Sequence, residues 1–391
     1  MNSKWTPCTL GDVCSSISKT YKRNDKSVVL VNTSDILEGK ILTTDEVPNE
    51  NLRGQFKKTF KKGDILYSEI RPKNKRYALV DFESTDNFIA STKLMVLRPN
   101  EKVTPEFLYL LLTESKTIDY FQTQAESRSG TFPQITFSEV VAPLQIAIPT
   151  IKEQMKIAEV ALGFDSKIDV NNKIIKTIGQ ILRVKHAKLT SRATETKKLD
   201  EIADVVDCLH SKKPVILDKG CNYIQLNAIG DDGLLFPDKV SKISPLDYKK
   251  WISRIEVSEG DCVITNVGRI GAVAKIPSGI KSAIGRNMTA IRLKKKFNIP
   301  TFLIQTLISD QMRREIDKRT DAGTIMGSLN VRSIPHLTFP WPSFDDIMRF
   351  EEQASQMRKL IEIKINENSS LKTLRDALLP KLLSGEIELK N

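Results

Sequence analysis

Two stretches of the chain carry apolar residues at the three- and four-residue spacing of a helix buried along one face. Eight such positions in residues 151–189 and 344–383 are Ile168, Ile175, Ile178, Leu182, Ile361, Leu371, Leu374 and Leu378. This spacing predicts the seam of a coiled coil, in which the polar residues Asn171, Lys185, Lys364 and Asn368 would set the register. A helix of about 40 residues is roughly 60 Å long and needs a partner for such a stripe. We expect the two helices to pack together, the alternative being that each is buried in its own domain.

Each long helix follows a segment whose short apolar runs predict a mixed α/β unit. Runs rich in β-branched and aromatic residues predict strands at 26–36, 64–70, 77–82 and 93–99, and again at 222–229, 261–267, 272–277 and 288–293. A helical run follows each set, at 104–125 and 300–319, before a proline-bounded segment leads to the long helix. We therefore expect an α+β protein with two mixed α/β domains and two long helices.

The two halves of the sequence repeat the same landmarks in the same order. Gly63-Asp64 matches Gly260-Asp261 at an offset of 197 residues. Four more pairs match at offsets of 189 to 195 residues: Leu10 with Leu199, Phe107 with Phe302, Gly130 with Gly323, and Pro149 with Pro342. Each match alone is weak, but five in one order at a nearly constant offset indicate homologous halves. The fold is therefore predicted to be an internal repeat with pseudo-two-fold symmetry.

Composition and charge narrow the class of partner. The 391 residues include 60 Lys and Arg against 48 Asp and Glu, and the net charge of +12 favours an anionic partner, most often nucleic acid. Membrane surfaces and ribosomes remain alternatives. The five cysteines form no C-x-x-C pair and the three histidines are scattered, so we expect no metal site and no disulfide framework. Because the N-terminus has no apolar h-region and no apolar run is long enough for a membrane span, we expect a soluble, cytoplasmic protein.

The glycine-rich stretch GDCVITNVGRIGAVAK, residues 260–275, is the clearest candidate for phosphate chemistry. It lacks the G-x-x-x-x-G-K-[ST] spacing of a P-loop, and its glycines lie between strand-like runs, whereas a dinucleotide-binding fingerprint opens a helix. Asp238 and Asp247 with Lys249 loosely resemble the acid pair and lysine of a nuclease, and this enzymatic alternative stays open. No other catalytic arrangement is found, so a non-catalytic protein is favoured.

Basic residues gather in loops of both halves. After Asp261 no carboxylate occurs until Asp310. Lys and Arg neutralise phosphates, glycines let backbone amides approach them, and Arg, Asn and Gln can bond base edges. The loops lie within residues 66–76, 91–93 and 128–134 of the first half and 264–275, 285–287 and 323–332 of the second. We expect DNA contacts from Arg71, Lys73, Lys75, Arg76, Lys93, Arg128, Gln134, Asn266, Arg269, Lys275, Arg286, Asn287 and Arg332.

With these features the chain resembles the specificity (S) subunit of Type I restriction–modification systems along its whole length. The resemblance is carried by KKGDILYSEI (61–70), SEGDCVITNVGRIGAV (258–273), the helix starts IPTIKEQMKIAEVA (148–161) and WPSFDDIMRFEEQA (341–354), and LKTLRDALLPKLLSGEIEL (371–389). The second helix start departs from the pattern, because Asp345-Asp346-Ile347 stands where Lys152-Glu153-Gln154 stands in the first.

The resemblance implies two target-recognition domains, residues 1–150 and 194–342, each reading one half of a bipartite DNA sequence. Two spacer helices, 151–193 and 343–391, would pack as an antiparallel coiled coil that sets the gap between the half-sequences. Two modification (methyltransferase) subunits would dock on this scaffold and restriction subunits would join for cleavage. S-adenosylmethionine, ATP and Mg²⁺ would belong to those partners, in the cytoplasm of a bacterium or archaeon. A coiled-coil DNA-binding regulator without methyltransferase partners is the remaining alternative.

Overall fold

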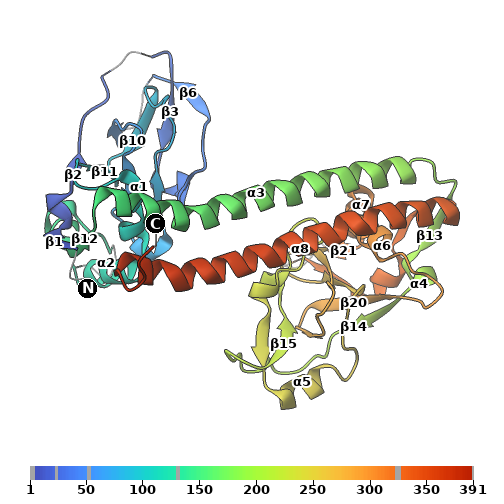
Figure 1. Ribbon diagram of the computed structural model, residues 1–391. Coiled ribbons are helices and arrows are strands. Elements are labelled where there is room, and N and C mark those ends of the chain that lie inside the picture. The colour runs from blue at the N-terminus through green and yellow to red at the C-terminus, as the bar shows by residue number, and fades with distance from the viewer. Residues whose placement is uncertain (1–4, 23–24, 51–53, 129–132, 322–326, 390–391) are drawn as a thin grey trace. The chain divides into compact units, whose positions relative to one another are not determined.

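The computed structural model describes residues 5–22, 25–50, 54–128, 133–321 and 327–389. The chain divides into two compact units, the first formed by residues 1–166 and 372–391 and the second by residues 167–371. Each unit contains one mixed α/β domain and a part of both long helices, α3 (Ile151–Thr190) and α8 (Phe344–Leu383), which are green and red in Figure 1. None of the helices in the described ranges is long and apolar enough to cross a membrane.

The first unit has two four-stranded sheets. One has the strand order β2-β11-β8-β9 and the other β6-β3-β10-β7, in which β3 and β10 are parallel, while β1 pairs with β12 and β4 with β5. The elements are β1 (Thr6–Thr9), β2 (Cys14–Ile17), β3 (Ser27–Val31), β4 (Ile36–Leu37), β5 (Lys40–Ile41), β6 (Glu46–Pro48), β7 (Phe56–Lys58), β8 (Ile65–Ser68), β9 (Tyr77–Leu79), β10 (Phe88–Ser91), β11 (Leu94–Pro99), α1 (Pro105–Thr113), α2 (Ser115–Arg128) and β12 (Gln145–Ile148).

The second unit repeats this topology. The sheet β14-β20-β17-β18 corresponds to β2-β11-β8-β9, the parallel pair β15 and β19 corresponds to β3 and β10, and β13 pairs with β23 as β1 does with β12. The elements are β13 (Glu195–Lys198), α4 (Leu199–Ile202), β14 (Ala203–Asp207), β15 (Cys221–Ile224), β16 (Ser241–Ile243), α5 (Pro245–Trp251), β17 (Cys262–Thr265), β18 (Val273–Lys275), β19 (Ala283–Ile284), β20 (Met288–Leu293), α6 (Pro300–Leu307), α7 (Asp310–Asp317), β21 (Thr320–Asp321), β22 (Ser328–Leu329) and β23 (Thr338–Trp341).

Landmarks matched in the sequence occupy equivalent places in the two units. Leu10 and Leu199 are buried, and the backbone N–H of each donates to a carbonyl oxygen, Leu144 in the first unit (3.0 Å) and Leu337 in the second (2.9 Å). Phe107 and Phe302 are both fully buried in helices α1 and α6. The matched pair Gly130 and Gly323 lies outside the described residues. The helical runs predicted at 104–125 and 300–319 are each two helices, and the Ser309 side chain starts α7 by accepting the Met312 N–H.

The repeated Gly-Asp pair forms the same structural lock in both units. Gly63 and Gly260 adopt φ of 84° and 86°, a left-handed conformation that glycine enters without strain. The buried carboxylate of Asp64 accepts two bonds from the Arg98 guanidinium, both at 2.7 Å. Likewise, Asp261 accepts bonds of 2.8 and 2.5 Å from Arg292. The repeated Gly-Asp motif therefore has a structural role in each unit, because its carboxylate binds an arginine of the same unit.

The long helices α3 and α8 pack together as an antiparallel pair. In the second unit the amide of Asn171 donates to Asn368 Oδ1 at 2.9 Å, and Lys185, further along α3, bonds Gln353, which lies earlier in α8. The partners move in opposite directions along the two helices, which establishes the antiparallel orientation. Asn171 and Asn368 are also 197 residues apart, the offset of the Gly-Asp pair. Of the four polar positions expected to set the register, Asn171 and Asn368 therefore bond each other across the seam, whereas Lys364 pairs with Glu367 of its own helix.

Most of the predicted seam residues lie in the packed face, with one correction. Ile168, Leu182 and Ile361 are buried, Ile175 and Ile178 pack against the core of the second unit, Leu378 packs against that of the first, and Leu371 is half-buried. Leu374 is 51% exposed, so its seam assignment is wrong. The face that continues from Leu371 reaches Arg375, four residues on, whose guanidinium pairs with Asp165 of α3.

The departure at the second helix start has a structural compensation. In the first unit the buried side chain of Gln154 on α3 accepts the Thr104 N–H at 2.8 Å, just before helix α1. Its sequence counterpart Ile347 is apolar and fully buried. Glu351, one helical turn later in α8, accepts the N–H groups of Thr301 and Phe302 at 2.9 and 2.7 Å. Burial raises the pKa of this carboxyl group, while the two backbone bonds oppose that shift.

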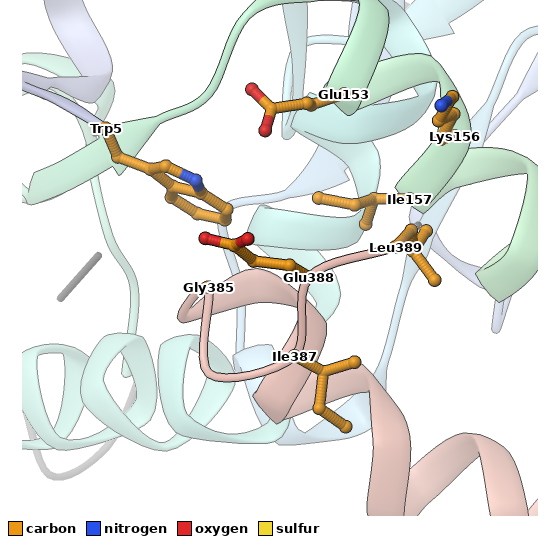
Figure 2. A pocket seen from close by; sticks show the side chains of 8 residues that line it. All are labelled: Trp5, Glu153, Lys156, Ile157, Gly385, Ile387, Glu388 and Leu389. Carbon is orange, nitrogen blue, oxygen red and sulfur yellow. The ribbon is translucent and has the colours of Figure 1, made fainter. Parts of the chain in front are cut away.

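The predicted spacer 343–391 is longer than the helix that the structure contains, because α8 ends at Leu383. The segment that follows folds back onto the first unit, where Ile387 and Leu389 pack against the core. Figure 2 shows this tail beside Trp5 and the first turns of α3, around a small cavity of about 30 Å³. The C-terminal segment is thus part of the first domain's core.

Candidate nucleic-acid interface

Three of the predicted DNA-contact segments meet at one backbone junction in each unit. In the first unit, the Glu69 N–H donates to Lys93 O at 3.0 Å, and Glu69 O accepts the N–H of Ile135, the residue directly after segment 128–134, at 2.8 Å. In the second, the Asn266 N–H donates to Asn287 O at 2.8 Å and Asn266 O accepts the Leu329 N–H at 2.9 Å. Glu69 and Asn266 are 197 residues apart. We call each meeting point a loop junction, since it joins loops that are distant in sequence.

A basic turn projects from the first loop junction. Arg71 (φ 47°) and Lys75 (φ 54°) both have left-handed backbones on either side of the 3-10 turn Pro72–Asn74. The Lys73 N–H donates to the buried Gln122 side chain at 3.0 Å, and the Arg71 N–H donates to Pro133 O at 3.1 Å. Left-handed residues other than glycine are costly and persist where surrounding contacts fix them, frequently at functional sites. The turn is therefore held in shape while its three basic side chains remain exposed.

The cations of the first unit differ in how freely they can move. Lys73 and Lys75 form exposed ion pairs with Asp119 (3.4 Å) and Glu38 (3.1 Å), and such pairs contribute little. Lys93 Nζ lies 3.3 Å from Gln134 Oε1, so these two predicted residues are neighbours. Arg128 pairs with Glu139 at the surface, and residues 129–132, also within the predicted loops, lie outside the described residues.

Arg76 has a structural role that the sequence did not indicate. Its guanidinium Nη1 donates to the backbone carbonyl oxygens of Ser34 (2.9 Å) and Ile36 (3.0 Å). These bonds connect the end of the basic turn to Ser34 and to Ile36, the first residue of β4. Arg76 therefore supports the loop, whereas the side chains of Arg71, Lys73 and Lys75 are exposed.

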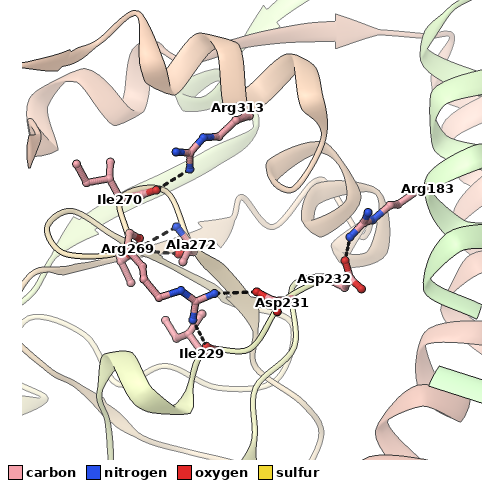
Figure 3. Close-up of polar contacts among 9 residues, drawn as sticks. Arg183, Ile229, Asp231, Asp232, Arg269, Ile270, Ala272 and Arg313 are labelled. Carbon is pink, nitrogen blue, oxygen red and sulfur yellow. Dashed lines mark hydrogen bonds and ion pairs between the residues drawn. The ribbon is translucent and has the colours of Figure 1, made fainter. Parts of the chain in front are cut away.

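The corresponding hairpin loop of the second unit is braced from several sides, as Figure 3 shows. The Arg269 guanidinium donates to Ile229 O at 2.6 Å and to Asp231 Oδ1 at 2.9 Å, and Arg313 donates to Ile270 O at 2.8 Å. Inside the loop, the Thr265 hydroxyl donates to Arg269 O and accepts the Ala272 N–H. The glycine-rich stretch 260–275 is thus a rigid hairpin, and Arg269 helps to hold it.

Two predicted contact residues of the second unit are buried, which corrects their assignment. Lys275 is only 9% exposed and its Nζ lies 2.8 Å from Glu362 Oε1 on α8. The buried side chain of Asn266 exchanges hydrogen bonds of 3.1 Å with the Thr289 hydroxyl. Both side chains are occupied inside the protein, so they stabilise the second unit and are not free to contact DNA.

Four predicted residues of the second unit are exposed: Arg269, which braces the hairpin loop, and Arg286, Asn287 and Arg332. Asn287 has a left-handed backbone (φ 64°) at the turn before β20, and asparagine tolerates this conformation better than most residues. In the part of the chain that the structure describes, no ion pair is formed by Arg286 or Arg332. Residues 322–326 of the predicted 323–332 loop lie outside that part.

The residues of the nuclease alternative have other roles or settings. Asp247 lies in the first turn of helix α5 and bonds the residue that caps it: Asp247 Oδ2 accepts the Ser244 hydroxyl at 2.9 Å, and the Asp247 N–H donates to Ser244 Oγ at 3.0 Å. Among the described residues, the His, Cys, Asp and Glu side chains close enough to hold a metal ion are Asp207, Cys208 and His210, a group that the sequence analysis missed. Asp207 already bonds His210 at 2.7 Å and faces Arg254 at 3.6 Å. Neither acid of the nuclease alternative belongs to this group.

Comparison with known proteins identifies relatives of about half of the chain. Residues 2–180 match the family model described as the Type I restriction modification DNA specificity domain. Over 181 residues the chain is 47% identical to the Type I restriction enzyme HindI specificity subunit of Haemophilus influenzae, an alignment that covers 46% of this chain and 39% of that relative.

The chain therefore contains, in residues 2–180, a Type I restriction modification DNA specificity domain. Its fold agrees with that of a solved specificity subunit, the Type-I restriction-modification system S subunit from M. genitalium, at a TM-score of 0.60 and 16% identity over 100% of this chain and 98% of the other. The HsdS subunit from Thermoanaerobacter tengcongensis is also similar, at 20% identity and a TM-score of 0.41 over 99% and 98% of the two chains. The region that the family model matches includes the whole loop junction of the first unit.

Proposed function

We propose that the chain is a specificity subunit that recognises a bipartite sequence in double-stranded DNA and assembles the subunits that act on it. Residues 1–150 and 194–342 are the proposed recognition domains, each reading one half of the target. The observation that carries the proposal is the repeated loop junction, which gathers three basic segments by equivalent backbone bonds in both units. The matched region spans 39% of the length of the curated relative. Recognition and assembly are therefore proposals for this chain, and they are argued from the residues described above.

The exposed cations supply the chemistry that DNA recognition needs. Arg71, Lys73 and Lys75 in the first unit and Arg286 in the second can neutralise phosphates, and arginine can also form paired bonds to guanine. The two junctions differ in content, with Glu69 in one and Asn266 in the other. We therefore expect the two half-sequences to be different.

The helices α3 and α8 would set the gap between the two half-sequences and dock two modification subunits. Restriction subunits would join this assembly for cleavage, and S-adenosylmethionine, ATP and Mg²⁺ would bind to those partners. The complex would work in the cytoplasm. The specificity subunit itself would perform recognition without catalysis, so the purified chain with Mg²⁺ is expected to leave plasmid DNA intact.

Single substitutions at the two junctions test the proposal. The specificity subunit would be co-produced with its modification subunits, and its target determined by selection from randomised duplexes. Arg71→Gln is expected to relax the sequence preference in one half only, and Arg286→Gln in the other half only. The loss of a paired arginine–guanine contact costs about 1–3 kcal/mol, or roughly a 5- to 150-fold loss of affinity.

Arg349→Gln provides a matched control, because Arg349 is an exposed arginine on α8. This variant should keep both half-sequences. The proposal is wrong if Arg71→Gln and Arg286→Gln alter the same half-sequence, or if both leave the selected target unchanged.

A further inference from the structure

A basic and apolar arm follows β14 in the second unit. The arm, residues 209–219, contains Lys212, Lys213 and Lys219, all exposed, and Asp218 is its one acidic residue. The three consecutive apolar residues Val215, Ile216 and Leu217 are 72%, 43% and 42% exposed. Isolated exposed apolar residues are ordinary, but a run of three between lysines is typical of a surface that contacts another molecule.

The two ends of the arm are anchored to the second unit. At its start, the Cys208 N–H donates to Met288 O at 3.2 Å, and Cys208 O accepts a bond of 3.1 Å from Arg254. Near its end, the Leu217 N–H donates to Lys242 O at 2.9 Å. Met288 directly follows Arg286 and Asn287, so the arm begins beside a segment of the loop junction.

The lysines of the arm are available to a ligand. Lys212 and Lys213 have no ion-pair partner among the residues that the structure describes. Their positive charge is therefore not neutralised within the protein, and an anionic polymer that reaches the loop junction would meet it next. The arm therefore adds unpaired positive charge beside the loop junction.

The first unit has a basic segment at the same place in its repeat. After β2, which corresponds to β14, come the exposed residues Lys19, Lys22 and Lys26. The Tyr21 N–H donates to Lys57 O at 2.8 Å, and Lys19 O accepts the Thr59 N–H at 2.9 Å. These bonds tie the segment to β7, which pairs with the end of β10 at Ser91, two residues before Lys93. A basic segment next to the loop junction is thus common to both units.

We propose that the arm is a second DNA contact of the second unit, in which Lys212 and Lys213 bind backbone phosphates and Val215–Leu217 pack against the duplex groove. This inference rests on the proposed function and adds contact residues to it. Lysines at phosphates strengthen binding to any sequence, and apolar side chains in a groove contact thymine methyl groups or widen a base step. The arm therefore contributes affinity, while the loop junction contributes most of the sequence preference.

The salt dependence of binding tests the role of the lysines. Affinity for a random-sequence duplex would be measured from 50 to 300 mM salt with the full chain in its complex with modification subunits. Lys212→Ala combined with Lys213→Ala is expected to lower the slope of log affinity against log salt by about two, since each phosphate contact contributes about 0.9. Lys295→Ala with Lys296→Ala removes the same charge beyond Leu293, at the end of β20 opposite the arm, and should leave the slope within error of the parent.

A second variant tests the apolar run. Val215→Ser with Ile216→Ser removes exposed apolar surface and should reduce affinity for the selected target several-fold without changing the melting temperature. If this variant binds DNA like the parent but captures less modification subunit, the arm is a protein-docking surface and the proposal is wrong. An unchanged salt slope in the lysine variant would overturn the proposal too. A parent complex without salt-dependent DNA binding would instead overturn the proposed function itself.

Discussion

The clearest single test of the structural reasoning is Asp261→Asn, which breaks the lock formed by the repeated Gly-Asp pair. Asp261 is 4% exposed, and its carboxylate accepts two bonds from the Arg292 guanidinium and one of 2.8 Å from the Ser258 N–H. Asparagine keeps the size of the side chain and can still accept from Ser258. It cannot neutralise Arg292, which would be left beside a neutral amide.

The expected loss in the free energy of unfolding depends on how exposed Asp261 and Arg292 are. Removing one member of a fully buried ion pair costs about 3–5 kcal/mol. The Arg292 side chain is 42% exposed and can regain water, so we expect a smaller loss, about 2 kcal/mol. For a unit of roughly 200 residues, each 1 kcal/mol lowers the melting temperature by about 2–4 °C, which predicts a fall of about 4–8 °C.

Scanning calorimetry and tryptophan fluorescence measure this loss, since Trp251 and Trp341 are buried in the second unit. Asp231→Asn is the matched control, because Asp231 pairs with Arg269 at 2.9 Å but its side chain is 92% exposed. This substitution should change the free energy of unfolding by no more than about 0.5 kcal/mol. DNA affinity should be retained by folded Asp261→Asn protein. A variant that melts like the parent yet loses DNA binding would refute the assignment of this acid to folding.

Two further predictions concern stability against pH and the length of the helices. Burial lowers the pKa of His186 to about 4, whereas an unfolded histidine protonates near pH 6.5. The free energy of unfolding should therefore fall as the pH drops from about 6.5 to 4. This residue alone should account for a loss of about 2 kcal/mol at pH 5. His186→Leu introduces the residue found 197 positions later in the chain, at Leu383. The free energy of unfolding of this variant, measured by urea denaturation, should not show this loss between pH 7 and pH 5. Four residues inserted near Ile175 would lengthen α3 by about 6 Å at 1.5 Å per residue, less than two base pairs of about 3.4 Å. Target selection should then show a gap changed by one or two base pairs with both half-sequences intact, and altered half-sequences with an unchanged gap would contradict the spacer assignment.

The architecture could be predicted because it depends on periodic and repeated features. The seam spacing identified both long helices, and the constant offset identified two equivalent units. Asn171 and Asn368 were expected to set the register, and they bond each other. Leu374 was misassigned because the apolar pattern does not reveal that Arg375 occupies the packed face by pairing with Asp165. A charged residue at a seam position is visible only once its partner on the other helix is known.

The candidate interface was predicted less completely, because charge alone does not show where a basic side chain is used. Lys275 counts as a free cation in the sequence, yet Glu362, which lies 87 residues later, neutralises it inside the protein. Arg292 lies in the same carboxylate-free stretch and is bound to Asp261. Glu69 was missed for the opposite reason: an acidic residue attracts no attention in a search for DNA contacts. Its alignment with Asn266 was the available signal, since both follow the Gly-Asp pair by the same number of residues.

The two units share the backbone geometry of the loop junction but differ in the side chains that it carries. This difference explains how a repeated fold can serve two different half-sequences. Backbone bonds at Glu69 and Asn266, the Asp–Arg locks and the order of one four-stranded sheet are the same in both units, so the loops emerge at equivalent places. The side chains presented there are unlike: the first unit offers the strained turn from Arg71 to Lys75, and the second offers a braced glycine hairpin with Arg286 and Asn287 beside it. Backbone hydrogen bonds do not depend on side-chain identity. Substitution of the exposed side chains can therefore change the sequence that is read while the junction that positions them is kept.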